Sequence, residues 1–171
     1  MEGLLINFDN LSSDDFDNKG DKLDGCWSLG EKRGNRPYIP PIGWEGFGLN
    51  INKYGEDKTW IGNTNAPGEW PVAYHGVGHN NVIRNSGSII KNNLKPGRRQ
   101  AYSNEVGTGV YVTPSIKVAE LYADGDYEYL VVFMCRVNPA SIREVKTVKE
   151  YWVVDGNSQC IRPYRILIKK R

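Results

Sequence analysis

Three side chains that could together break a glycosidic bond occur in order along the sequence: His75, Tyr111 and Glu150. A carboxylate stabilises the positive, oxocarbenium-like charge that builds on a sugar as such a bond breaks. A tyrosine ring can stack on a planar leaving group, and a neutral imidazole can hydrogen-bond a sugar hydroxyl. The order of the three residues suggests a site that breaks a glycosidic bond in a dinucleotide.

Each residue also has a purely structural interpretation. A histidine that ends a strand is often a core residue, and a tyrosine can be a core aromatic whose hydroxyl reaches water. A glutamate that opens a strand can be an exposed edge charge. We favour the catalytic interpretation because all three residues occur in one order, each beside a β-prone run.

Apolar and β-branched runs predict the strands that position these side chains, and two longer patterns predict helices. The strands are expected at 48–54, 59–62, 71–74, 109–113, 127–137, 150–154 and 161–169, and the helices at 80–94 and 114–122. The first two strands could form a hairpin. The run 127–137 is apolar on both faces and predicts a central, covered strand. Residues 162–164 predict a bulge or an edge feature.

Composition limits the classes of function. The chain has 171 residues, with 22 Lys and Arg against 20 Asp and Glu, so its formal charge of +2 does not indicate a dedicated nucleic-acid binder. Cys26, Cys135 and Cys160 lack zinc or disulfide spacing, which fits a reducing compartment. We find no leader pattern and no apolar run of about 18 residues. We therefore expect an intracellular protein, cytoplasmic or nuclear, with no membrane segment and no metal.

The chain divides into two parts of different composition. Residues 10–24 are rich in Asp, Ser, Asn and Lys with few apolar anchors, so residues 1–35 are expected to form a flexible N-terminal extension. Residues 36–171 are expected to form a single domain. Nothing in the sequence indicates an oligomeric state.

The motifs resemble those of ADP-ribosyltransferases of the poly(ADP-ribose) polymerase type, whose catalytic domain carries a His-Tyr-Glu triad on three strands. Tyr74-His75-Gly76 is similar to the first motif, the run 107–122 to the second and the run 150–169 to the third. The resemblance covers about residues 70–169. It implies an α+β fold, namely a split β-sandwich with flanking helices and a central cleft for NAD as co-substrate.

The resemblance also implies a role for each matching residue. Glu150 would stabilise the ribose charge and orient the acceptor nucleophile, and His75 would hydrogen-bond the adenosine-side ribose. The backbone of Gly76 would meet the nicotinamide carboxamide. Tyr111 and Tyr122 would stack on the nicotinamide ring as its near and far partners.

Two positions depart from the family pattern. Val77 stands where the family usually has Ser or Thr, and the helix after Tyr111 lacks the serine that often holds the nicotinamide amide. Ser115 offers the nearest hydroxyl, so we include it among the donor-binding candidates. Glu144 lies one short segment before Glu150 and makes the assignment of the glutamate the least constrained.

The implied activity is mono-ADP-ribosylation of a macromolecular acceptor, with protein preferred to nucleic acid. Chain growth is not expected because residues 1–70 lack a helical-bundle pattern. Two alternatives stay open. One is a non-catalytic module that binds NAD or ADP-ribose, or a protein partner. The other is an RNA 2′-phosphotransferase, in which Arg98-Arg99 would grip phosphates.

Overall fold

The most β-prone run in the chain forms the centre of the larger sheet. The computed structural model describes residues 8, 10–22, 26–78, 82–98, 100–124, 128–148 and 150–171. Strand β6 (Tyr129–Val137) pairs antiparallel with β4 (Val72–Gly76) on one side and with β9 (Ile161–Lys170) on the other. Strand β3 (Glu45–Gly48) pairs with the outer side of β9, giving the order β3-β9-β6-β4. All of β6 after Tyr129 is buried, so the prediction of a covered central strand is confirmed.

A smaller antiparallel sheet packs beside the larger one. Its strands are β5 (Val110–Val112), β8 (Trp152–Val154) and β7 (Arg143–Glu144), in the order β5-β8-β7. Tyr74 in β4 and Thr113 after β5 exchange backbone hydrogen bonds of 2.7 and 3.0 Å, which join the two sheets. Short strands β1 (Lys32–Arg33) and β2 (Arg36–Pro37) form a separate ribbon. The chain is thus a mixed α+β protein with antiparallel sheets.

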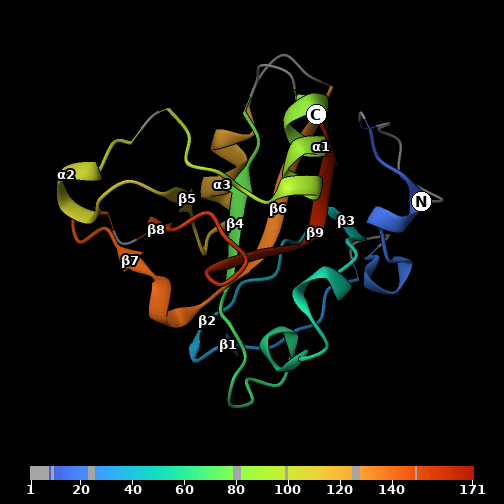
Figure 1. Cartoon of the computed structure of the whole chain (residues 1–171), viewed down its shortest axis with the longest axis horizontal. Coiled ribbons are helices and arrows are strands. Elements are labelled where there is room, and N and C mark those ends of the chain that lie inside the picture. The colour runs from blue at the N-terminus through green and yellow to red at the C-terminus, as the bar shows by residue number, and fades with distance from the viewer. Residues whose placement is uncertain are drawn as a thin grey trace.

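Helices α1 (Val82–Asn92) and α3 (Ile116–Tyr122) cover opposite faces of the larger sheet (Figure 1). Helix α1 buries Val82, Ser86 and Ile90, which are spaced four apart and therefore share one face. Helix α3 buries Ile116 and Ala119 in the second core. A third helix, α2 (Ser103–Val106), lies between α1 and β5, where the sequence predicted neither a helix nor a strand. The core on the α1 side also takes in Val112 and Val154 of the smaller sheet, and the core on the α3 side takes in Trp27, Trp44 and Trp60.

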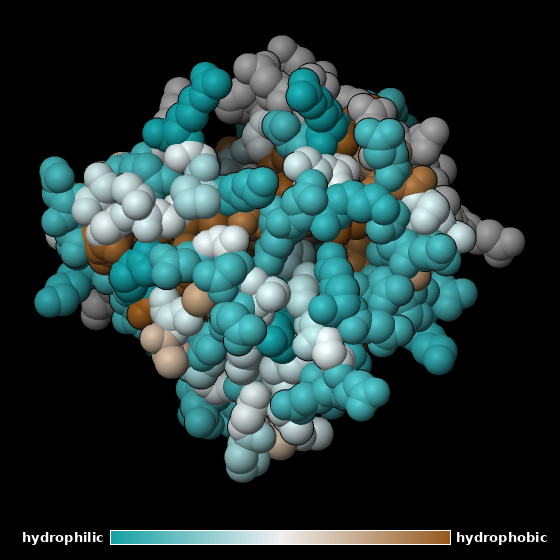
Figure 2. Space-filling model, in the orientation of Figure 1, coloured by the Kyte–Doolittle hydropathy of each residue, from teal (hydrophilic) through white to brown (hydrophobic). Residues whose placement is uncertain are grey.

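Polar side chains cover most of the face shown in Figure 2, with hydrophobic atoms visible between them in a band across the middle. No helix in the described ranges is long and apolar enough to cross a membrane.

The predicted hairpin of 48–54 and 59–62 is wrong. Both runs instead contain 3-10 turns, at Asn52–Tyr54 and Thr59–Ile61. Side-chain hydrogen bonds account for the first turn, because the Asn50 side chain accepts from the Asn52 backbone N–H at 2.9 Å. Short polar side chains of this kind compete with strand pairing.

The described part of the first 35 residues packs against the larger sheet, where the sequence predicted a flexible extension. Phe16 forms a backbone bridge with Leu49, and Lys22 forms one with Gly46. Trp27 is 9% exposed and its indole N–H donates to the Trp44 carbonyl at 3.2 Å. The segment has few apolar residues, but Phe8, Phe16 and Trp27 are large and pack in or against the two cores.

Strand β9 contains the irregularity expected at residues 162–164. The register with β6 shifts between Met134 and Cys135, which pair with Arg165 and Pro163, so Tyr164 is the extra residue of a bulge. The ends of the other predicted elements lie within about two residues of the observed ones. This small difference matters at β8, which begins two residues after Glu150 and so leaves that residue outside the strand.

Candidate active site

A small cavity of about 60 Å³ lies where the two sheets meet, beside α3. It is lined by Tyr74, His75, Gly76, Tyr111, Val112, Thr113, Ala119, Tyr122 and Tyr151. Four of the predicted site residues, His75, Gly76, Tyr111 and Tyr122, therefore line one cavity although 47 residues separate the first from the last. The Tyr74–Thr113 bridge lies in the wall of this cavity and fixes β4 against β5 there.

The imidazole of His75 is held in one orientation by β5. Its Nδ1 lies 2.8 Å from the carbonyl oxygen of Tyr111. A carbonyl can only accept, so Nδ1 carries the proton and donates. Burial lowers the pKa of His75 below its ordinary value, which favours the neutral ring. In that form Nε2 carries a lone pair and can accept a hydrogen bond from a ligand hydroxyl.

The backbone of Gly76 presents a donor and an acceptor on the side of β4 that faces β5. The backbone N–H of Val77 donates to Val131 in β6, and residues two apart on a strand direct their backbone groups to the same side. The N–H and C=O of Gly76 therefore point the other way, as do those of Tyr74, which reach Thr113. No other part of the described chain bonds to these two groups of Gly76.

Glycine at position 76 also allows α3 to approach β4 closely. A Cβ at this position would lie 2.2 Å from the carbonyl oxygen of Ala119 and 2.8 Å from the backbone nitrogen of Ala123. From the sequence, Gly76 was expected only to bind the nicotinamide carboxamide through its backbone. The structure gives it a packing role as well.

Three tyrosines, Tyr111, Tyr122 and Tyr151, line the cavity, and the ring of Tyr102 packs against two of them. The ring of Tyr102 stacks on that of Tyr111 with centroids 6.3 Å apart, and Tyr151 lies 5.7 Å from Tyr102 and 6.0 Å from Tyr122. The Tyr111 hydroxyl accepts a hydrogen bond of 2.7 Å from the Tyr102 backbone N–H. Burial and a hydrogen bond with Tyr151 raise the pKa of Tyr122 above its ordinary value. The cluster thus ties the loop before β5 to the cavity.

Two predicted residues lie outside the cavity lining. Ser115 is the N-cap of α3, and its hydroxyl accepts from the Val118 backbone N–H at 3.3 Å. Glu150 is exposed in the turn before β8 and does not open the strand as predicted. It directly precedes Tyr151, which does line the cavity. The upstream candidate Glu144 forms an ion pair with Arg36.

The two departures from the family pattern have clear structural positions. Val77 is 3% exposed and packs in the core on the α1 side, so its side chain points away from the cavity. Ala119 lines the cavity and supplies a methyl group where a serine would supply a hydroxyl. Of the two α3 residues that line the cavity, only Tyr122 therefore carries a polar side-chain group.

Sequence reasoning missed Tyr102, Tyr151 and Gln100. The Gln100 side chain both donates to and accepts from the Gly109 backbone, at 3.1 and 3.0 Å, and so holds the start of β5. Tyr151 could have been found as the neighbour of Glu150. Tyr102 and Gln100 lie in an irregular loop whose sequence carries no periodic signal.

Within the described ranges, no three His, Cys, Asp or Glu side chains gather in a way that could hold a metal ion. His79, the second histidine, lies outside these ranges. A scan against protein-family models finds no match, and a search of curated proteins finds no significant relative.

Proposed function

We propose that this chain is an NAD-dependent mono-ADP-ribosyltransferase and that the small cavity binds the nicotinamide end of NAD. One observation carries the proposal, namely that three kinds of group line the same cavity. They are the acceptor nitrogen of His75, the backbone N–H and C=O of Gly76, and tyrosine rings. These are the groups that a ribose hydroxyl, a carboxamide and an aromatic ring would need. The arrangement of two antiparallel sheets around the cavity supports the split β-sandwich fold implied by the sequence resemblance.

Each residue has a chemical task in this proposal. Nε2 of His75 accepts a hydrogen bond from a ribose hydroxyl, and the N–H and C=O of Gly76 bind the carboxamide. Tyr111 and Tyr122 contact the nicotinamide ring. The bond between ribose C1′ and the nicotinamide nitrogen breaks, with its electron pair leaving on nicotinamide.

Glu150 supplies the negative charge that this reaction needs. Its carboxylate stabilises the positive charge on the ribose through a ribose hydroxyl and accepts the proton of the attacking acceptor group. The acceptor atom then bonds to C1′, and we place it on a protein side chain. Glu150 is exposed beside the cavity, where both a ribose and an acceptor could reach it.

The size of the cavity limits how NAD can bind. Sites that enclose a whole ligand measure about 300–1,000 Å³, whereas this one measures about 60 Å³. Only the nicotinamide end would lie inside it. The remainder of NAD would extend along the edge of β4 and the loop before β5.

A non-catalytic NAD or ADP-ribose module is the second candidate. Two features favour it. Glu150 is exposed and does not line the cavity, and Ala119 lines the cavity without a side-chain hydroxyl. The RNA phosphotransferase alternative has less support: Arg98 is exposed and Arg99 lies outside the described residues.

The experiment is to measure nicotinamide release and ADP-ribose transfer from labelled NAD with wild type, Glu150→Gln, His75→Ala and the control Glu56→Gln. Glu56 is an exposed carboxylate between the turns Asn52–Tyr54 and Thr59–Ile61, and it lines neither the small cavity nor the larger one described below. We expect Glu150→Gln to lose about 100-fold or more of the rate, and Glu56→Gln to retain it. If Glu150→Gln releases nicotinamide as fast as wild type, the catalytic proposal fails. If NAD raises the melting temperature without turnover, the binding module is correct.

A further inference from the structure

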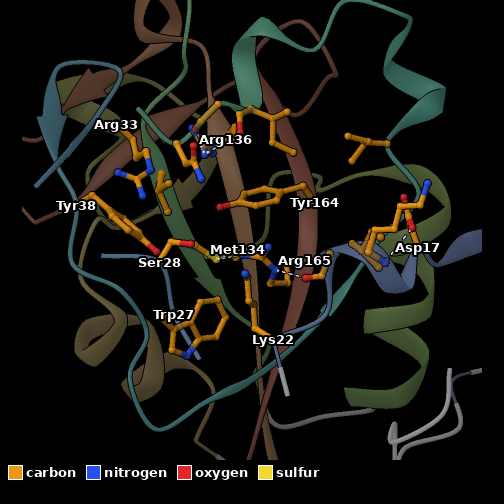
Figure 3. A pocket seen from close by; sticks show the side chains of 18 residues that line it. Asp17, Lys22, Trp27, Ser28, Arg33, Tyr38, Met134, Arg136, Tyr164 and Arg165 are labelled. Atoms are coloured by element: carbon orange, nitrogen blue, oxygen red, sulfur yellow. Dashed lines mark hydrogen bonds between the residues drawn. The ribbon is translucent and has the colours of Figure 1, made fainter. Parts of the chain in front are cut away.

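A second, larger cavity lies between the larger sheet and the N-terminal segment. It measures about 440 Å³, within the range of sites that enclose a small molecule. Its walls come from β6 and β9, from the residues between 17 and 38, and from the loop around Ile61 (Figure 3). It shares no lining residue with the cavity at His75.

Cations dominate the lining of this cavity. Arg33, Arg136 and Arg165 line it together with two lysines, against the single carboxylate of Asp17. That carboxylate already accepts a hydrogen bond from the backbone of Lys19. Among the described residues, no ion pair involves any of the three arginines.

Among the described residues, the two most buried arginines, Arg33 and Arg136, have no carboxylate within ion-pair distance. Arg33 and Arg136 are each 3% exposed. Arg136 donates to four backbone carbonyls but its Nε has no partner, and Glu69 influences it only from beyond ion-pair distance. Arg33 donates to the Lys32 carbonyl at 2.8 Å. Buried charges in proteins are usually paired, so this concentration of positive charge calls for an anion.

Arg165 has guanidinium donors that the protein does not use. Its Nε donates to the Gly20 carbonyl at 2.8 Å and its Nη1 to the Met134 sulfur at 3.5 Å, while Nη2 has no partner among the described residues. The bulge in β9 places both Tyr164 and Arg165 in the cavity lining, although neighbouring residues of a regular strand face opposite sides. A planar guanidinium with free N–H groups suits a phosphate.

Aromatic rings line the same cavity. Arg33 lies 4.4 Å from the ring centre of Tyr38, and Arg165 lies 5.3 Å from that of Trp27 and 5.2 Å from that of Tyr164. Figure 3 shows the Tyr38 ring beside Arg33, and the Tyr164 ring lies between Arg136 and Arg165. Large flat rings beside arginines can hold a planar base while the arginines hold its phosphate.

We infer that this cavity is a nucleotide site, in which Arg33 and Arg165 bind the phosphate and Trp27 and Tyr38 contact the base. The site is separate from the proposed NAD cavity and does not depend on transferase activity.

Calorimetry with AMP, inorganic phosphate and adenosine tests the site in the full chain. We expect AMP to bind more tightly than either fragment, and Arg165→Met to weaken AMP binding about 10- to 100-fold. The control Arg84→Met removes an exposed cation from α1 and should bind as wild type does. His75→Ala should keep AMP binding, which separates this site from the NAD cavity. AMP binding that is absent, or equal in wild type and Arg165→Met, overturns the inference.

A photoreactive 8-azido-AMP locates the base without relying on a variant. We expect labelling within residues 26–38, in the walls formed by Trp27 and Tyr38. Labelling confined to Tyr102, Tyr111 or Tyr122 would place AMP in the other cavity and overturn the assignment. If Arg165→Met does not fold, Arg165→Lys keeps the charge but loses the planar fork, and it should also weaken AMP binding.

Discussion

At the scale of single residues, the tautomer of His75 decides what its ring can do. Nδ1 is committed to the Tyr111 carbonyl, so only Nε2 can meet a ligand. The neutral ring accepts through Nε2, whereas the protonated ring cannot accept at all. Protonation of His75 in acid should therefore remove the hydrogen bond that Nε2 would accept from a ribose hydroxyl in the proposed function.

His75 should make the stability of the fold depend on pH. Burial lowers its folded pKa below the ordinary 6.5. Between these two values the unfolded state binds more protons, so the free energy of unfolding decreases as the pH falls below about 6.5. Urea unfolding of wild type and His75→Gln at pH 7.5 and 5.5 measures this. The decrease should be smaller in His75→Gln, and an equal decrease in both proteins would contradict the prediction.

The sequence predicted the identity of the cavity residues better than their roles. His75, Tyr111 and Tyr122 were identifiable because each lies beside a periodic strand or helix. The hydroxyl of Ser115 could not be assigned from sequence, because capping of α3 and binding of a ligand need the same residue type. Tyr102 lies against Tyr111 and Tyr151 because of the path of an irregular loop, which the sequence does not reveal.

At the scale of elements, α3 is held by the residue that caps it and by its contact with β4. The Ser115 hydroxyl caps the helix, and Gly76 gives it room against the strand. Both residues were expected to bind NAD directly.

Substituting Ser115→Ala should lower the free energy of unfolding by about 1 kcal/mol, because α3 loses its N-cap. Nicotinamide release per folded molecule should stay the same, since the hydroxyl does not line the cavity. Denaturant unfolding and the release assay measure the two quantities. A loss of activity at unchanged stability would instead support the donor-binding role that the sequence suggested.

Substituting Gly76→Ala should destabilise the fold by about 1–3 kcal/mol, because the new methyl group would overlap the backbone of α3. Gly97→Ala is the matched control, since a Cβ at that position would meet nothing within 4 Å. Urea denaturation of both variants measures the difference. Equal stability in the two would show that α3 can move away from β4 without loss.

At the scale of the whole molecule, the N-terminal segment is part of the fold and forms one wall of the larger cavity. It supplies Trp27 and Arg33 to the larger cavity. The sequence predicted the central strand and both main helices correctly, because long apolar patterns determine them. It did not predict the packing of this segment, because a few large residues isolated among polar ones do not form the periodic apolar pattern from which helices and strands are predicted.

Trp27→Ala should therefore lower the free energy of unfolding by about 3 kcal/mol, as expected when a large buried ring is removed. Leu29→Ala is the control in the same segment, since Leu29 is 81% exposed and should change stability by less than about 0.5 kcal/mol. Thermal or urea unfolding compares the two. A flexible extension would make both substitutions neutral.

The backbone bridge between Tyr74 and Thr113 has a mechanical consequence. It is the one ladder contact between the two sheets within the described chain, and it lies in the wall of the small cavity. Two further links join the sheets beside this bridge: the His75–Tyr111 hydrogen bond, and the shared core that holds Ala73 and Val131 with Val112 and Val154. We therefore expect the two sheets to keep a fixed angle, so that the His75 ring and the Tyr111 backbone stay in place whether or not the cavity is filled.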